Sequence, residues 1–484
     1  MRGISAVQAV RFSAFFAFLA VLAGCRSARL EFQPQLKPRI VVMTDIGPAR
    51  VEPDDNESAV RLMSYADRFE IEGIITTVGW NCDPYPSEWA EYLTRVTDGY
   101  VTDVHNLMKR SNQTEFQSLE QENRSQTLGY WPSAEYVKSR CVMGSQRAGI
   151  GVIGPENETE GSRLIRDLLL EDDGRPIWFL AWGSANTLAQ AVWRFQHELA
   201  PDEFKRILNR IRLYTITDQD MVYAMRMNRD YSSHMWLREN FARDLMLVWD
   251  ESAWLAQNEN GKNDWESYAK YIQGHGAMGR DYPKFLWGVE GDTPSFLHVM
   301  PNGLNDPDDP TQVGWGGYHT FALSPDRKTY AWTNWQQPEN RISRSFEDRF
   351  YTDEFADFAA RMEWAETGSG NTNPVLVVNG DSGLAPIEMT VPAGKTVTID
   401  ASRSFDPEGN GLSFHWEFQP FAGYDGPVPA ISDADARKIK VTMPESDGTE
   451  HDHHLILTVH DDGNFSLASY RRVIIHTKRQ PNSN

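Results

Sequence analysis

The feature that most constrains the fold is a repeated alternation of short, continuously apolar segments with segments of helical periodicity. The apolar segments are residues 39–45, 71–79, 176–182, 210–216 and 245–250. The helical segments between them are residues 54–69, 87–110, 161–172, 184–199 and 236–241, with an interruption expected at Gly99. Strands that are apolar throughout are typical of a parallel sheet that is covered on both faces. The sequence therefore predicts an α/β domain with a mostly parallel sheet and helices on both faces.

The character of the chain changes near residue 366. Residues 38–365 carry the alternating pattern, with a polar loop region expected over 111–160 and a closing helix over 353–365. Residues 366–374 are rich in Gly, Ser and Asn, which is typical of a linker. Residues 375–478 then show short alternating strands with turns such as DPEGNG, which predict a small all-β sandwich of the immunoglobulin-like kind, followed by a tail at 479–484.

The N-terminus has the layout of a secretion signal. Arg2 and Arg11 precede or begin an apolar stretch that ends at residue 23, and Leu-Ala-Gly-Cys follows at 22–25. This ending resembles a bacterial lipobox, so we expect a lipoprotein signal peptide over 1–24, lipid on Cys25, and a tether over 25–37. Arg26, directly after the Cys, favours delivery of the lipoprotein to the outer membrane. The protein would face either the periplasm or the cell exterior. The alternative is an ordinary signal peptide with an incidental Cys.

Charge and cysteine content exclude some classes of function. The formal net charge of −21 argues against nucleic-acid binding, which needs clustered Lys and Arg. Besides Cys25, only Cys82 and Cys141 are present, and either a disulfide or two free thiols is compatible with the sequence. Neither lies in a Cys/His cluster that would indicate zinc.

Acidic residues follow the first predicted strand. Asp45 comes at its end, and Asp54 and Asp55 begin the next helix. In parallel sheets ligands lie outside the carboxyl ends of the strands, and Ca²⁺ prefers carboxylate and carbonyl oxygens. The pattern therefore indicates a cation site, although acids at a helix start also act simply by complementing the helix dipole.

Several segments, in order, resemble known proteins. Asp45, the Asp54-Asp55 pair, Ile75-Thr76-Thr77-Val78-Gly79, Asn81, and FLAWGSANTLAQAV at 179–192 resemble the nucleoside hydrolases. Two departures stand out, because Met43 replaces an Asp of that family and ten positions, in place of five, separate Asp45 from Asp55. The segments at 52–55, 214–220, 274–279, 290–304 and 314–319 resemble a sister group, the nucleoside-hydrolase-like "cellulose-binding" family of secreted bacterial proteins, which carries a small β-rich C-terminal domain.

The resemblance implies a metal and a set of site residues. It implies Ca²⁺ held by Asp45, Asp54, Asp55 and Asp292, with Asp45 also the general base. It implies substrate contacts from Asn81, Asn186, Asp218, Asp220, His275, Glu290, Trp315 and Tyr318. Helix capping for the two Asn, turn chemistry for Asp218 and Asp220, a tight turn at His275, and core packing for Trp315 and Tyr318 stay open as alternatives.

Three functions are compatible with this sequence. The first is a calcium-dependent hydrolase of a furanoside or glycan fragment, and the second is a carbohydrate-binding protein that no longer catalyses a reaction. The third is a nucleoside N-ribohydrolase, which the lipoprotein signal and the β domain disfavour. The expected partners are a carbohydrate ligand and the membrane that holds the lipid, and a homo-oligomer also stays open.

Overall fold

A computed structural model of the chain describes residues 35–220, 232–423 and 426–478. The predicted signal peptide, Cys25 and most of the predicted tether lie outside these residues. No helix within the described ranges is long and apolar enough to cross a membrane. Cys82 and Cys141 are both free thiols.

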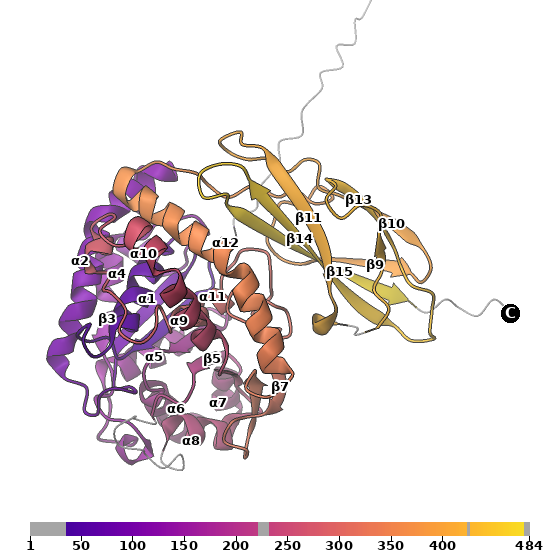
Figure 1. Ribbon diagram of the computed structural model, residues 1–484. Coiled ribbons are helices and arrows are strands. Elements are labelled where there is room, and N and C mark those ends of the chain that lie inside the picture. The colour runs from indigo at the N-terminus through magenta and orange to yellow at the C-terminus, as the bar shows by residue number, and fades with distance from the viewer. Residues whose placement is uncertain (1–34, 221–231, 424–425, 479–484) are drawn as a thin grey trace, which may run out of the picture. The chain divides into compact units, whose positions relative to one another are not determined.

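An eight-stranded sheet forms the centre of the α/β domain (Figure 1), and it confirms the predicted fold class. Its strands are β1 (Arg39–Thr44), β2 (Glu70–Thr76), β3 (Cys141–Met143), β4 (Ile177–Ala181), β5 (Ile211–Ile216), β6 (Met246–Asp250), β7 (Thr320–Leu323) and β8 (Tyr330–Thr333). The order is β3-β2-β1-β4-β5-β6-β8-β7, and only the edge strand β7 is antiparallel to its neighbour. The strand order changes direction between β1 and β4, which is where open α/β sheets bind their ligands.

Helices cover both faces of this sheet. They are α1 (Pro53–Ser64), α2 (Ala90–Arg110), α3 (Leu119–Glu122), α4 (Ala134–Ser139), α5 (Glu160–Leu170), α6 (Asn186–Glu198), α7 (Pro201–Leu208), α8 (Ser233–Phe241), α9 (Ala253–Asn263), α10 (Trp265–Tyr271), α11 (Thr293–His298) and α12 (Glu339–Thr367), with short 3₁₀ turns between some of them. Alternate residues of β1 enter opposite cores: Ile40 and Val42 pack with α1 and α2, and Val41 and Met43 pack with α5 and α6. This two-sided burial explains the continuously apolar strands.

Three local features differ from the sequence-based expectation. The region 111–160 is not only loop, because it contains α3, α4 and β3, and β3 pairs with β2 at the sheet edge. Helix α2 continues through Gly99, where a Cβ atom would lie 2.8 Å from the Cα of Met278, so Gly99 serves close packing and does not break the helix. Helix α12 begins at Glu339, well before the expected start at residue 353.

The C-terminal region is all β, as predicted. One sheet has the order β10-β13-β12 and the other β11-β14-β15-β9. The strands are β9 (Ile387–Pro392), β10 (Thr396–Asp400), β11 (Leu412–Gln419), β12 (Ala430–Ile431), β13 (Lys438–Thr442), β14 (His451–Asp461) and β15 (Ala468–Lys478). Apolar residues from both sheets, including Ile399, Trp416 and Leu457, form a separate core between them. This arrangement is a β-sandwich.

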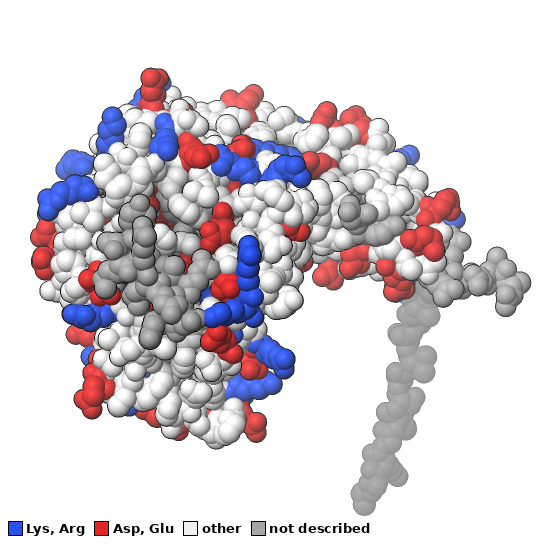
Figure 2. Space-filling view, turned by 60° about the horizontal axis from the view of Figure 1, so that its bottom comes forward, with Lys and Arg blue, Asp and Glu red and all other residues white. Residues whose placement is uncertain are grey.

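Charged side chains are spread over the surface. On the face shown in Figure 2, acidic and basic side chains are interspersed over the α/β domain. The net charge of −21 therefore coexists with many local pairs of opposite sign, an arrangement that is typical of a solvated surface.

Candidate metal and substrate site

Five carboxylates gather at the carboxyl end of β1, next to the change in strand order. Asp45 follows β1, Glu52 is the N-cap residue of α1, Asp54 and Asp55 lie in its first turn, and Asp292 is the N-cap residue of α11. Ligand atoms of Asp45, Glu52 and Asp55 all lie within 4.8 Å of one another, and so do those of Asp54, Asp55 and Asp292. The structure thus brings together the four acids that the resemblance implies as ligands, and adds Glu52.

The local sequence explains how the acids reach one place. Pro53 fixes the start of α1, where it lacks only an amide hydrogen that the helix would not use. Asn56 Nδ2 donates to Gly47 O at 2.8 Å and to Glu52 O at 2.9 Å, which holds the long loop after β1 against the helix. A Cβ atom at Gly79 would lie 2.2 Å from the Asp45 carboxylate, so only glycine leaves room for that side chain.

Burial raises the pKa of all five carboxylates, and repulsion from neighbouring acids adds to this rise for Asp45, Glu52, Asp55 and Asp292. Burial, together with the charges of Asp55 and Asp54, raises the pKa of Asp45 well above its usual value. Burial raises the pKa of Asp55 to about 8, and the Asp54 charge adds to this rise. The pKa values of Glu52 and Asp292 are raised well above their usual values by burial and by the neighbouring carboxylates. For these four acids, the charges that destabilise the ionised form come from the cluster itself.

Some oxygens of the cluster are buried and have no partner. Within the described residues, Asp45 Oδ2, Asp54 Oδ1 and Asp292 Oδ2 accept no hydrogen bond. An unpaired buried carboxylate oxygen is costly unless a cation neutralises it. Several carboxylate oxygens that are close enough to coordinate the same ion suit a hard divalent cation such as Ca²⁺. These residues therefore fit the metal that the resemblance implies.

Sequence reasoning did not identify Glu52 as a member of the cluster. Its side chain accepts no hydrogen bond from the amides of α1, so it does not cap the helix. It instead accepts a hydrogen bond from Asn81 Nδ2 and lies beside Asp45 and Asp55. The available signal was its place directly before Pro53, at the end of the lengthened loop, but sequence spacing does not distinguish a capping acid from one that faces a metal.

Of the two predicted asparagines, Asn81 lies beside the cluster and Asn186 lies at the start of α6, just after β4. The exposed Asn81 follows β2 and contacts Glu52. Asn186 is buried at the start of α6, and its Nδ2 donates to Gly149 O at 2.7 Å. No described residue bonds to Asn186 Oδ1, so this amide oxygen retains the capacity to accept a hydrogen bond from a ligand hydroxyl.

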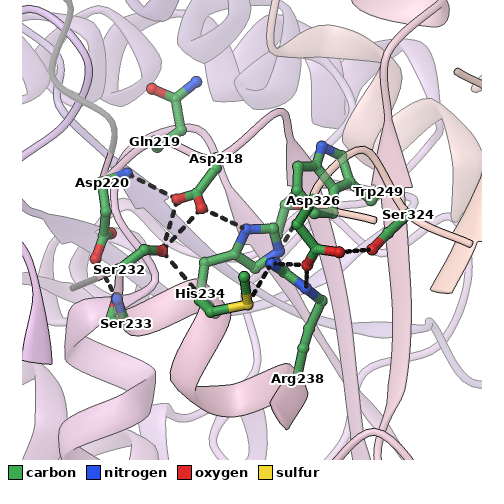
Figure 3. Close-up of polar contacts among 12 residues, drawn as sticks. Asp218, Gln219, Asp220, Ser232, Ser233, His234, Arg238, Trp249, Ser324 and Asp326 are labelled. Atoms are coloured by element: carbon green, nitrogen blue, oxygen red, sulfur yellow. Dashed lines mark hydrogen bonds and ion pairs between the residues drawn. The ribbon is translucent and has the colours of Figure 1, made fainter. Parts of the chain in front are cut away.

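Asp218 and Asp220 form a polar network with three serines, two of which Figure 3 shows. Asp218 accepts from Ser232 Oγ at 2.8 Å on each carboxylate oxygen, and Asp220 accepts from the backbone amide of Ser233 at 2.5 Å. Asp220 also accepts from the hydroxyl of Ser184. Burial and the Asp218 charge raise the pKa of Asp220 to about 6. These bonds fix the start of α8 against the ends of β4 and β5, so both acids position the chain there, and their contact with substrate stays a prediction.

Glu290, predicted as a substrate contact, forms a buried ion pair. Its carboxylate accepts from Arg61 Nη1 at 2.6 Å and from Tyr282 Oη at 2.9 Å. Both side chains of the ion pair are fully buried. With these donors around it, Glu290 stabilises the packing of α1 against the loop before α11.

The remaining three predicted substrate residues also have structural contacts. The ring of His275 contacts Glu366 Oε2 at 2.6 Å and Lys270 O at 2.8 Å, in a turn whose flanking Gly274 and Gly276 have positive φ. Trp315 is buried, with its Nε1 donating to Tyr470 Oη at 3.4 Å. Tyr318 is buried with its ring 6.2 Å from that of Phe421. These contacts agree with the turn and core-packing alternatives, and the ligand contacts of the three residues stay predictions.

Two family models and one solved structure match large parts of this chain. The family described as "Cellulose-binding Sde182, nucleoside hydrolase-like domain" matches residues 39–319, and the "Cellulose-binding protein Sde0182, C-terminal domain" matches residues 396–477. A nucleoside hydrolase-related hypothetical protein from Saccharophagus degradans, described as associated with carbohydrate metabolism, is 32% identical with a TM-score of 0.77 over 91% of this chain and 100% of that chain. No curated protein matches the chain.

Two further solved structures match with low scores. The PKD domain from the KIAA 1837 protein is 25% identical, with a TM-score of 0.17 over 24% of this chain and 98% of that chain. The endo-fucoidan hydrolase MfFcnA9 is 9% identical, with a TM-score of 0.18 over 93% of this chain and 82% of that chain. These scores carry no argument about function. The family matches and the Saccharophagus degradans structure show that this chain belongs to the cellulose-binding, nucleoside hydrolase-like Sde182 family.

Proposed function

We propose that this protein is a calcium-dependent glycoside hydrolase that acts on a furanoside or a glycan fragment in the bacterial cell envelope. The observation that carries the proposal is the cluster of five acids at the switch point of the sheet, with buried oxygens that have no partner among the described residues. A surface that only binds sugar does not need such a cluster. The family's association with carbohydrate supports the substrate class.

Each residue of the site has a chemical task in this proposal. Bound to Asp45, Asp54, Asp55 and Asp292, a Ca²⁺ ion would supply positive charge that lowers the pKa of a nearby water and orients neighbouring sugar hydroxyls. Asp45 Oδ2 would accept the proton of the attacking water, because it is the oxygen of the general base that has no hydrogen bond within the described structure. Asn81 and Asn186 would bond sugar hydroxyls.

The place of the protein in the cell is part of the proposal. A lipid on Cys25 and the tether that follows would hold the α/β domain at the outer membrane, where glycan fragments are available. Labelling with a radioactive fatty acid tests this: we expect label on the wild type and none on Cys25→Ser. Label that persists on Cys25→Ser would contradict the anchor.

Hydrolysis itself is tested with defined substrates. The purified protein is incubated with nitrophenyl furanosides and pyranosides, cellulose and other glycan fragments, and purine and pyrimidine nucleosides, in calcium and in EDTA. We expect release of sugar from a glycoside in calcium only. Preference for nucleosides would favour the ribohydrolase, and no hydrolysis of any substrate by the calcium-loaded protein would overturn the proposal.

Removal of calcium is expected to lower stability through this site. At a hundredfold excess over its Kd, one bound ion adds about 2.7 kcal/mol to the free energy of unfolding. Asp55→Asn should abolish this gain, because Asp55 belongs to both groups of ligand atoms. In EDTA the variant should unfold above the wild-type Tm at pH values above 8, where the carboxyl of Asp55, whose pKa is raised to about 8, would otherwise ionise among the neighbouring acids.

Thermal unfolding with EDTA and with calcium measures both effects. Asp172→Asn is the matched control, because it removes an exposed acid beyond the end of α5. A calcium response that is the same in Asp55→Asn and in the wild type would place the ion elsewhere.

One observation favours carbohydrate binding without catalysis as a second candidate function. Phe321 on β7 and Tyr330 on β8 are 57% and 54% exposed, and their ring centroids lie 5.9 Å apart with an angle of 28° between the planes. They border a hollow of about 450 Å³ that also contains the charged side chains of Arg243 and Lys328. Exposed aromatic faces beside polar groups suit the stacking of sugar rings.

Removing both rings is expected to weaken binding to cellulose. Each lost ring contact is worth about 1 kcal/mol, so Phe321→Ala with Tyr330→Ala should weaken binding about tenfold or more. Pull-down with insoluble cellulose measures this, and Phe405→Ala in the C-terminal domain, which removes a ring that is 44% exposed, is the control. Equal binding by the double variant and the wild type would exclude this surface.

A further inference from the structure

The five carboxylates form two triads and not one ring. The first triad is Asp45, Glu52 and Asp55, and the second is Asp54, Asp55 and Asp292, with Asp55 common to both. Within each triad the ligand atoms lie within 4.8 Å of one another, but the five acids do not form a single group by this measure. The arrangement is therefore two adjoining sites that share one carboxylate.

The dimensions of each triad suit one ion. Calcium–oxygen distances are about 2.3–2.6 Å, so two oxygens on opposite sides of one ion are at most about 5 Å apart. Oxygens within 4.8 Å of one another can thus surround a single cation. The ligand atoms of the five acids do not all satisfy this distance together, so one ion placed in a triad would not be surrounded by all five.

Unpartnered atoms point to a ligand in each triad independently. Asp45 is 2% exposed and Asp292 is 4% exposed, and neither Asp45 Oδ2 nor Asp292 Oδ2 has a hydrogen-bond partner in the described parts of the chain. Asp45 belongs to the first triad and Asp292 to the second. Two buried carboxylate oxygens, one in each triad, therefore lack a positive or donating neighbour.

The charge of the cluster also favours two ions. When all five acids are ionised around bound metal, one divalent cation reduces their charge of −5 to −3 and two reduce it to −1. Repulsion left among buried acids is costly because the interior screens charge poorly. Where two metal ions share a site in other enzymes, they lie about 3.5–4 Å apart and together stabilise attacking and leaving oxygens.

We propose that the site holds two divalent cations bridged by Asp55, with Glu52 as a ligand of the first. This proposal rests on the metal dependence of the proposed function and extends it. The lengthened loop after β1 then has a specific consequence, because it ends at Glu52 and so supplies a ligand beside Asp45 and Asp55. The class of ligand is a hard divalent cation, Ca²⁺ or Mn²⁺.

Calorimetric titration of the metal-free purified protein with Ca²⁺, and separately with Mn²⁺, tests the number of ions. We expect two ions per chain in the wild type and one in Glu52→Gln, which removes a ligand of the first triad only. Asp292→Asn should also bind one, because it affects only the second triad. Glu88→Gln, which changes an acid with no part in either triad, should bind two. Circular dichroism verifies that each variant is folded.

A crystal soaked in Mn²⁺ gives a second measurement that needs no variant, since two anomalous peaks are expected beside Asp55. One ion in the wild type, with no change in Glu52→Gln, would overturn the second site and leave the calcium dependence of the proposed function intact. Absence of any bound ion in the wild type would overturn both. Two ions in Glu52→Gln would overturn the assignment of Glu52.

Discussion

Asp45→Asn is expected to lower kcat on a hydrolysed glycoside by about 10²–10⁴-fold, the usual contribution of a general base. The substitution keeps the size of the side chain, which the close approach of Gly79 demands, but it removes the proton acceptor. Asp45 is also a proposed ligand, so calcium affinity should fall as well. Saturating calcium should therefore restore the bound ion but not the rate.

Initial rates at several calcium concentrations separate these two effects. Asp172→Asn, an exposed acid outside the cluster, should keep the wild-type kcat. Recovery of the full rate by Asp45→Asn in excess calcium would show that Asp45 only holds the metal. Another group would then have to accept the proton of water.

Glu290→Gln is expected to destabilise the protein by about 3–5 kcal/mol, because it leaves the buried guanidinium of Arg61 without its counter-charge. That guanidinium also donates to the backbone oxygen of Glu354 at 2.9 Å and lies over the ring of Phe358, and neither group carries a net charge. Urea unfolding should show a lower midpoint with an unchanged slope. This outcome would support a structural role for Glu290.

The exposed pair of Arg95 and Glu91 on α2 provides the matched control. Its side chains are 51% and 57% exposed, so Glu91→Gln should change the stability by less than about 1 kcal/mol. If Glu290→Gln were as stable as the wild type but lost affinity for carbohydrate, Glu290 would be a ligand contact after all. A structural role for Glu290 would therefore appear as a loss of stability, and a ligand contact would appear as a loss of affinity.

Much of the fold is predictable from the sequence because it depends on local periodicity. The runs Arg39–Thr44 and Ile177–Ala181 are apolar throughout since both faces of each strand are buried. The helices between the strands are predictable because their apolar residues recur at helical spacing on the face that is buried against the sheet. Strand β3 was missed because it has only three residues, none of them fully buried, so its sequence carries no comparable signal.

The roles of the aromatic residues far from the first strands were harder to predict from the sequence. Trp315 and Tyr318 lie among glycines, which suggested a loop that presents rings to a ligand. Their burial depends on Tyr470 and Phe421, which are more than a hundred positions away in the chain. No local pattern reports contacts at that distance.

The sequence by itself determined where the acids could meet. An acid at the end of a buried strand and two more at the next helix start must lie at one edge of a parallel sheet, because the chain geometry allows nothing else. Only the tertiary structure decided which acids complete the cluster. Glu52 and Glu290 have the same side chain, yet one lies beside Asp45 and the other pairs with Arg61, 229 positions away. The fate of a buried charge depends on the neighbours that folding brings to it, and those neighbours are not encoded in the residues beside it.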